Sequence, residues 1–295
     1  MTAKLLIGDR AYSSWSLRGW LLFARFGLDV DVDLAHLLTD GFATALEGYA
    51  PAKTVPAAKI DGAPISDSLA LLEHLNDLHP GAGFWPEDLP KRAIARSLVA
   101  EMHASFATLR TLCPMNLHRA YLPAAEIEED LARDLERLQT LWALARSASG
   151  TGPWLFGQYT AVDAFFAPVA ARIATYALPM EPEDLAYVET HLADPPFRRW
   201  RAMALADPVR MERYEFDRPE RPWPGPVPLP AAVAEGPAIN TACPFSGRPV
   251  VADGIAEIGG VRVGFCNRFC REKVIADPLA WPEVGALLAP HLATA

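Results

Sequence analysis

The sequence predicts an α/β domain, an all-α domain and a small α+β extension. The first 80 residues alternate between strand-like and helical patterns, and the segment from about residue 91 is continuously helical. Three of the four cysteines lie beyond a proline-rich stretch. We therefore expect domains over 1–80 and 90–215, a proline-rich linker over 216–238 and a cysteine-containing extension over 239–295. The linker could instead be a strap that lies across the helical domain.

The composition is that of a soluble globular protein. Of the 295 residues, 51% are hydrophobic and 21% are charged, and the net charge of −9 argues against a nucleic-acid or anionic-membrane partner. The N-terminus lacks the features of a signal peptide, and no apolar run approaches the roughly 20 residues that span a bilayer. Four cysteines do not suggest a secreted disulfide scaffold. We expect a cytoplasmic protein.

The elements of the first domain follow from hydrophobic periodicity and turn signals. Asp61-Gly62 separates two short apolar runs and is typical of a hairpin turn. Pro80 and Gly81 end the last helical pattern. The expected strands cover 4–8, 28–37, 57–60 and 63–65, and the expected helices cover 15–26 and 66–79. The resulting order, β-α-β followed by β-β-α, describes a thioredoxin-like layout.

Two amphipathic helices open the second domain. Apolar residues recur at steps of three and four from Ile94 to Leu109, and again from Ile127 to Trp142. Further on, Thr160 and Asp163 have the spacing of a helix capping box, and the apolar run AFFAPVAARI follows them. This region is predicted to be all-α.

These segments together resemble the soluble glutathione transferases over residues 4 to about 214. The stretch YSSWSLR (12–18) is similar to the serine motif of the zeta-like transferases and maleylacetoacetate isomerases, with Trp15 where that family normally has cysteine. Thr54-Val55-Pro56 resembles the segment before the family's cis-proline, and Ser66-Asp67-Ser68 resembles its acidic-Ser motif. The Thr160/Asp163 box is similar to one in the family's helical domain. The resemblance implies a thioredoxin-like domain, an all-helical transferase domain, glutathione as co-substrate, and a homodimer.

Residues 12–18 lie where a strand gives way to a helix, so their serines could cap the helix or contact the glutathione sulfur. A free thiol has a pKa of about 8.5, so an enzyme that uses it must favour the thiolate. A hydroxyl hydrogen bond and a helix N-terminus together supply a stabilisation of that size. The resemblance implies Ser13 as the donor, with Ser14 second and Ser16 third. Capping alone remains an alternative.

Three downstream segments could hold the rest of glutathione. A cis bond between Val55 and Pro56 would let the peptide pair with Val55 in strand fashion, although a trans proline after a loop is the alternative. Asp67 and Ser68 start a helix whose free N–H groups suit the γ-glutamyl carboxylate, and capping is compatible with that role. Lys53 could reach the glycyl carboxylate or be a solvated lysine.

The electrophile is expected between the two domains, against the first helix of the helical domain. Met102 and Phe106 could line its pocket but suit a core better, whereas His103 and Arg110 do not suit a core. Arg110 could orient an acidic substrate or be structurally paired. Tyr12 is the fifth candidate for this pocket.

The C-terminal segment carries Cys243, Cys266 and Cys270, with a Gly259-Gly260 hairpin signal between the first two cysteines. It resembles the small YHS/TRASH metal-binding domains, with Ser246 in place of a second knuckle cysteine. The resemblance implies a metal site, and zinc is the first candidate although a zinc site usually has four ligands. Three thiolates with an open position would suit another soft ion. A metal-free segment and a disulfide are the alternatives.

The sequence therefore favours a glutathione S-transferase in which an N-terminal serine activates the thiolate for attack on a small electrophile. A glutathione-dependent cis-trans isomerase is a variant of the same chemistry. The alternative from another class is a non-catalytic, transferase-like binding protein whose C-terminal segment binds metal or a partner.

Overall fold

The computed structural model describes residues 2–292 and divides into two compact units. Unit 1 contains the described residues up to Leu192 together with Met211–Pro224, and unit 2 contains Ala193–Arg210 together with the described residues from Gly225 onward. The chain therefore passes from unit 1 into unit 2 at Ala193, returns to unit 1 at Met211 and enters unit 2 again at Gly225. None of the helices in the described part of the chain is long and apolar enough to cross a membrane.

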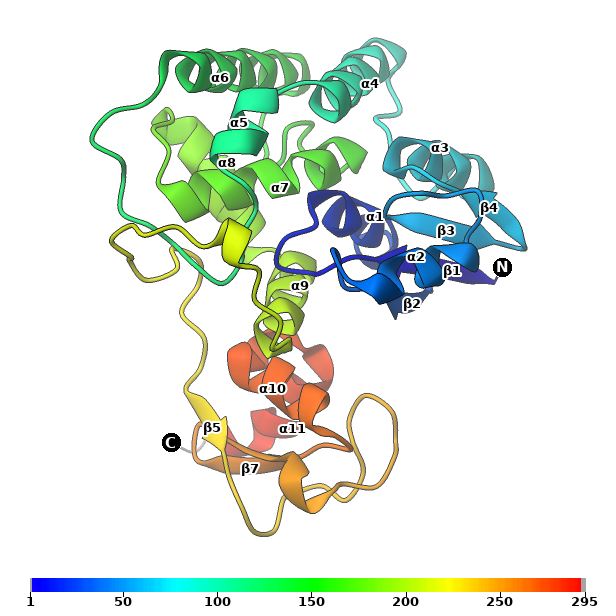
Figure 1. Ribbon diagram of the computed structural model, residues 1–295, viewed down its shortest axis with the longest axis vertical. Helices are drawn as coiled ribbons and strands as arrows, with labels where there is room; N and C mark the ends of the chain where they lie inside the picture. Colours follow the sequence, from blue (N-terminus) through cyan, green and yellow to red (C-terminus); the bar gives the residue numbers. More distant parts are fainter. Residues whose placement is uncertain (1, 293–295) are drawn as a thin grey trace. The chain divides into compact units, whose positions relative to one another are not determined.

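A four-stranded mixed sheet forms the N-terminal part of unit 1 (Figure 1). The strand order is β2-β1-β3-β4, and β1 is parallel to β2 and antiparallel to β3. Asp61 and Gly62 have positive φ angles of 47° and 88° and form the predicted turn between β3 and β4. The strands are β1 (Ala3–Ile7), β2 (Asp31–Leu34), β3 (Ala57–Ile60) and β4 (Ala63–Ile65).

The helices of this part are α1 (Ser14–Ala24), α2 (Asp40–Glu47) and α3 (Ser68–Leu78). α1 and α3 were predicted from their apolar periodicity, and α1 packs against both α3 and β1. The sequence prediction placed a loop where α2 lies. Leu46 is the one fully buried side chain of this eight-residue helix, so its apolar stripe is too short to be recognised. With α2 added, the thioredoxin-like layout is confirmed.

The helical part of unit 1 consists of α4 (Leu89–Ala104), α5 (Ala107–Leu112), α6 (Glu129–Ser149), α7 (Ala161–Tyr176) and α8 (Pro182–Ala193). α7 is buried along its whole length, as its apolar run predicts, and packs against α1 and α4. The predicted capping box is confirmed, because the Asp163 carboxylate accepts the Thr160 N–H at 2.8 Å and the Thr160 side chain accepts in return.

The helix predicted across residues 94–109 is broken. α4 ends at Ala104, and Phe106 has a left-handed φ of 65° before α5 begins. The Phe106 side chain is buried, so the break carries an apolar residue into the core. Arg110 folds back and donates to the carbonyl oxygens of Met102 and His103, which satisfies the open end of α4. The prediction of one continuous helix from Ile94 to Leu109 is therefore wrong.

The proline-rich stretch is split between the two units. Its first part lies along the helical part of unit 1, where Leu122 N donates to Pro219 O at 2.9 Å and the Arg221 guanidinium donates to Ala174 O at 2.7 Å. The 3₁₀ helix η1 (Glu212–Tyr214) precedes it. The second part leads into a strand of unit 2. The stretch is thus a strap over its first half and a connection over its second.

Unit 2 packs one helix from the middle of the chain against the C-terminal segment. Strands β5, β6 and β7 form an antiparallel sheet with the predicted turn at Gly259-Gly260, and α9 packs on α10 with an Arg198–Asp277 ion pair at 2.7 Å. α9 was expected within the helical domain over 90–215, so the compact units differ from the predicted boundaries. The elements are α9 (Pro195–Ala206), β5 (Ala231–Val233), η2 (Ala252–Gly254), β6 (Ile255–Ile258), β7 (Val261–Gly264), α10 (Arg268–Ala276), η3 (Pro278–Ala280) and α11 (Pro282–Leu292).

Candidate functional site

A cavity of about 420 Å³ lies within unit 1 at the start of α1. Its lining is apolar and hydroxyl-rich, carries two arginines, and includes no carboxylate among the described residues. The N-terminal part contributes Tyr12, Ser13, Ser14, Trp15, Leu37, Phe42, Thr54 and Val55. The helical part and the strap contribute Arg110, Pro114, Met115, Arg172 and Tyr214. This is the concave, locally positive kind of site that suits an anionic small molecule.

Ser13 is the N-cap residue of α1 and faces the cavity. Its hydroxyl oxygen accepts the Ser16 N–H at 3.3 Å, and it donates to the Ser16 hydroxyl at 2.7 Å. Ser16 Oγ also accepts the Gly8 N–H at 2.9 Å. Because the first N–H groups of a helix have no partner within it, the cavity wall at Ser13 is a place where negative charge is stabilised.

Ser14 has a different partner. Its hydroxyl oxygen accepts a hydrogen bond from Nη2 of Arg172 at 2.8 Å, and both side chains are buried. Arg172 also donates to the carbonyl oxygen of Pro168, one turn earlier in α7. Its Nε has no hydrogen-bond partner in the described part of the chain. A buried guanidinium with an unused donor is suited to hold an anionic group in the cavity.

The Trp15 ring contacts two arginines. The guanidinium of Arg110 is 4.5 Å from the centre of the Trp15 ring, and that of Arg18 is 5.1 Å from it. Arg18 is buried, donates to Phe165 O at 3.1 Å and also stacks on the Phe165 ring. The tryptophan face therefore holds Arg110 at the cavity wall by cation–π attraction.

Burial and neighbouring positive charges lower the pKa values of Arg18 and Arg172. Burial lowers the pKa of Arg18 well below its usual value, and the positive charges of Arg110 and Arg172 lower it further. Burial, with a contribution from Arg110, also lowers the pKa of Arg172 to about 10. A bound anion would counteract both causes, because a nearby negative charge favours the charged form of a guanidinium.

The residues expected to hold glutathione are arranged as follows. The Val55–Pro56 bond is cis, and Val55 lines the cavity. Asp67 caps α3, where its carboxylate accepts from Leu69 N at 2.7 Å. Ser68 is fully buried and its hydroxyl has no hydrogen-bond partner among the described residues. Lys53 is exposed.

The five residues expected to form the substrate pocket do not all line the cavity. Tyr12 and Arg110 line the cavity, whereas Met102, His103 and Phe106 are not among its lining residues in the described chain. Met102 and Phe106 are core residues with 1% and 4% exposure, and His103 Nε2 lies 3.5 Å from the Asp67 carboxylate.

Sequence reasoning missed two arginines, Arg18 and Arg172. The signal for Arg172 was present, because it is a lone charged residue in the apolar run AFFAPVAARI. A charge in a buried helix needs a partner or a function, and that observation alone would have selected it.

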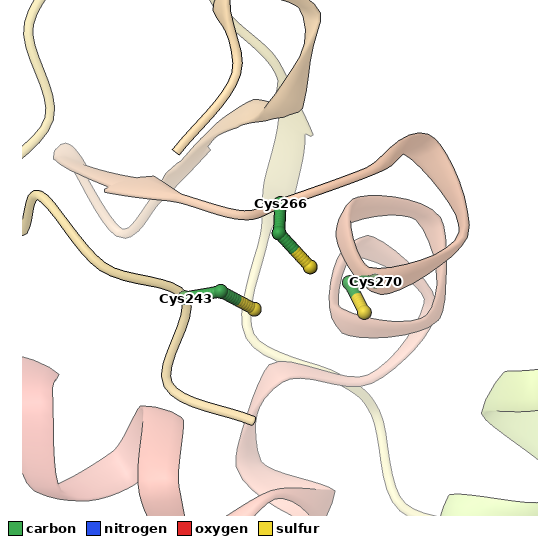
Figure 2. A group of neighbouring side chains, drawn as sticks. All are labelled: Cys243, Cys266 and Cys270. Carbon is green, nitrogen blue, oxygen red and sulfur yellow. The ribbon is translucent and has the colours of Figure 1, made fainter. Parts of the chain in front are cut away.

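Figure 2 shows the sulfur atoms of Cys243, Cys266 and Cys270 pointing toward one another in unit 2. All three lie within 4.8 Å of one another, and all four cysteines of the chain are free thiols. They come from the loop that precedes η2, the connection between β7 and α10, and the first turn of α10. Ser246 Oγ lies 3.3 Å from the sulfur of Cys266.

The surroundings of this cysteine cluster lower the pKa of Cys243 and raise that of Cys270. Burial would raise the pKa of Cys243, but hydrogen bonds from the Cys266 and Phe245 N–H groups outweigh it and lower the pKa to about 7. Burial raises the pKa of Cys270 to about 11 against the attraction of the nearby Lys273 ammonium. Lys273 lies over the rings of Phe245 and Trp281, at 3.5 and 4.0 Å from their centres.

Comparisons with known proteins agree with the fold. Residues 12–78 match the family described as "Glutathione S-transferase, N-terminal domain". A maleylacetoacetate isomerase from Rattus norvegicus is 37% identical over 99 residues, which are 32% of this chain and 44% of that protein. One from Dictyostelium discoideum is 31% identical over 115 residues, 38% and 52% of the two chains. The chain thus spans about half the length of these curated relatives, and the matches support the soluble glutathione transferase family.

Solved structures show the same fold. A glutathione transferase homolog from Burkholderia with bound glutathione has a TM-score of 0.53 at 22% identity, and covers 69% of this chain and 98% of its own. Ure2p in complex with S-hexylglutathione has a TM-score of 0.51 at 17% identity, and covers 68% and 98% of the two chains. The described chain therefore has the glutathione transferase fold, a thioredoxin-like sheet followed by a helical domain.

Proposed function

We propose that unit 1 is a glutathione-dependent enzyme in which Ser13 stabilises the glutathione thiolate for attack on a small electrophile. The observation that carries this proposal is the position of the Ser13 hydroxyl at the first residue before α1, on the wall of a cavity without acidic residues in the described chain. The relatives named as isomerases and the fold neighbours with bound glutathione support the same chemistry.

The energetics are sufficient without a side-chain base. Lowering the thiol pKa by about 2 units below its usual value of about 8.5 takes roughly 2.7 kcal/mol. A hydrogen bond to a charged sulfur contributes about 1.5–3 kcal/mol, and a helix N-terminus adds about 0.3–1 kcal/mol. Ser13 at the start of α1 offers both contributions from one place.

We assign the remainder of glutathione to Val55, which lines the cavity, and to residues that are not among its lining: Lys53, Pro56, Asp67 and Ser68. Its backbone would pair with Val55, beside Pro56, and its γ-glutamyl carboxylate would bind the N-terminus of α3 at Asp67 and Ser68. The buried, unpartnered Ser68 hydroxyl supports this assignment, because such a group is stabilised by an acceptor. Lys53, which is exposed, would reach the glycyl carboxylate.

The electrophile is proposed to carry an acidic group. Arg172 and Arg110 both line the cavity, and no carboxylate of the described chain forms an ion pair with Arg172. An acid held by these arginines would place its reactive carbon near the sulfur at Ser13. Either conjugation or reversible addition to a double bond would then follow, in a transferase or in an isomerase. Trp15 in place of the cysteine of the isomerase motif favours the transferase.

Glutathione-resin retention and activity assays separate catalysis from simple binding. We expect wild-type protein to bind glutathione and to conjugate small electrophiles, and Ser13→Ala to lose most of the activity while it still binds. Ser14→Ala is the matched control at the neighbouring hydroxyl and should lose less. A protein that binds glutathione but shows no activity that depends on either serine would be the non-catalytic binding protein. We expect a homodimer, which sedimentation would test.

The cysteine cluster supports a second proposal, that unit 2 binds a zinc ion or another soft metal ion. Three thiolates that converge within 4.8 Å match the ligand chemistry of zinc. Bound there, a metal would cross-link the loop at Cys243, the β7–α10 connection at Cys266 and α10 at Cys270. Elemental analysis of the purified chain tests this directly. Stoichiometric metal that is lost in Cys266→Ser supports the site, and metal-free wild-type protein after refolding with zinc contradicts it.

A further inference from the structure

Ser16 is placed to control the Ser13 hydroxyl although it is not among the cavity-lining residues. It is fully buried in the first turn of α1, and its oxygen lies 2.7 Å from the oxygen of Ser13. The N–H of Gly8, at the end of β1, donates to the same Ser16 oxygen at 2.9 Å. Ser16 thus ties the strand end to the residue that caps the helix.

The number of protons in this network limits which of its groups can donate and which can accept a hydrogen bond. A hydroxyl carries one proton and two lone pairs, and a backbone N–H can only donate. The Gly8 N–H therefore occupies one lone pair of Ser16 in every state. When Ser13 is the donor in this pair, its proton is engaged by Ser16 and is not offered to a ligand in the cavity. If Ser13 is to donate to a ligand instead, the bond between the two hydroxyls survives only when Ser16 becomes its donor.

We propose that Ser16 is a positioning residue: when glutathione binds, the Ser13–Ser16 hydrogen bond reverses, so that Ser16 donates to Ser13 and Ser13 donates to the sulfur. This inference rests on the proposed function of Ser13. No covalent bond between heavy atoms changes. The thiol releases its proton to water, and each hydroxyl keeps its own proton while rotating it. The donors then align from Gly8 through Ser16 and Ser13 to the thiolate.

Two physical effects follow from this alignment. The Ser13 oxygen accepts from the Ser16 hydroxyl, so its own O–H is polarised and becomes a better donor to a charged sulfur. The Ser13 rotamer is also fixed by two contacts, the hydroxyl at 2.7 Å and the Ser16 N–H at 3.3 Å. Without the Ser16 hydroxyl, only the longer backbone contact would remain.

The test is the pKa of glutathione bound to the protein, measured from thiolate absorbance against pH with no electrophile present. Ser16→Ala should raise this pKa by about one unit, which lowers the thiolate fraction about tenfold at a pH below it. Ser13→Ala should raise it at least as far. The double variant should match Ser13→Ala alone, because Ser16 acts through Ser13. The other titratable groups of the lining, Arg110, Arg172, Tyr12 and Tyr214, are the same in all these variants.

A matched control for Ser13→Ala is Thr160→Ala, which removes the buried N-cap hydroxyl of α7 instead of that of α1. It should lower the melting temperature but leave the thiol pKa unchanged. If Ser16→Ala does not fold, Ser16→Cys keeps the side-chain size with a weaker donor and should raise the pKa by a smaller amount.

The outcomes separate this inference from the proposal it rests on. A wild-type protein that does not bind glutathione, or a Ser13→Ala variant without a pKa change, overturns the proposed function. A pKa raised by Ser13→Ala but unchanged in the Ser16 variants overturns the role of Ser16 alone. Additive shifts in the double variant would also contradict it, since Ser16 would then act independently of Ser13.

Discussion

The hydroxyl of Ser14 accepts a hydrogen bond from the buried guanidinium of Arg172 at 2.8 Å, across 158 positions of sequence. The contact joins the start of α1 to α7 and separates the roles of the two adjacent serines. The Ser13 hydroxyl is hydrogen-bonded to the Ser16 hydroxyl at the start of α1, whereas the Ser14 hydroxyl is hydrogen-bonded to Arg172. The first is suited to a sulfur atom, and the second fixes a cation beside it.

Arg172→Met should selectively impair acidic substrates. Loss of a charge-assisted hydrogen bond of about 1.5–3 kcal/mol predicts a decrease in kcat/KM of about 10- to 100-fold for an electrophile with a carboxylate. A neutral electrophile of similar reactivity should lose much less. Steady-state kinetics with the two substrates check this, and Arg133→Met, which removes exposed ion pairs with Glu129 and Asp130, is the control. Equal losses for both substrates would assign Arg172 a purely structural role.

Trp15→Leu should weaken the position of Arg110. The variant removes a cation–π contact at 4.5 Å worth about 0.5–1 kcal/mol, so kcat/KM for the acidic electrophile should fall about 2- to 5-fold. Trp15→Phe retains an aromatic face and should fall less. Steady-state kinetics of Trp15→Leu and Trp15→Phe, measured together with Arg110→Met, check this prediction. If the Leu variant matches wild type while Arg110→Met does not, the tryptophan does not position the arginine.

His191 should make the stability of unit 1 sensitive to mild acid. Burial, with a smaller contribution from Arg25, lowers its pKa to about 3, whereas the unfolded chain has a pKa of about 6.5. Between these values the unfolded state binds the additional proton, so stability is lost as pH falls below 6.5. The loss from pH 7 to pH 5 is about 2 kcal/mol. Denaturant unfolding of wild type and His191→Gln at both pH values checks this, and parallel losses in the two proteins would contradict it.

Ser246→Cys should strengthen the metal site of unit 2. The Ser246 oxygen lies 3.3 Å from the sulfur of Cys266, so a thiolate there would supply a fourth soft ligand. We expect affinity for zinc to rise by at least about tenfold. Competition with a chromogenic chelator measures it, and Cys113→Ser, in unit 1, is the control. Weaker binding by the Ser246 variant would show that the cluster does not bind metal through this side.

Much of the layout of unit 1 could be predicted because its signals are local. The Asp61-Gly62 turn, the Thr160/Asp163 box and the apolar periodicity of α1 and α3 all depend on residues close in sequence. α2 could not be predicted, since a short helix with one fully buried residue leaves almost no periodic pattern.

The remaining features depend on contacts between distant segments. The break at Phe106 is completed by Arg110 donating back to α4, and α9 leaves the helical part to pack on α10. The residues around Arg110 and those of α9 carry no local pattern that indicates these distant partners. The Ser14–Arg172 contact is of the same kind, although the lone arginine in an apolar helix was a readable signal.

The pKa of glutathione bound to wild-type protein and to Ser13→Ala tests the central claim most directly. The account predicts a wild-type value about 2 units below the free thiol value of about 8.5, and a return most of the way toward that value in Ser13→Ala. Glutathione that binds wild type with an unshifted thiol pKa, or an equally lowered pKa in both proteins, would contradict it.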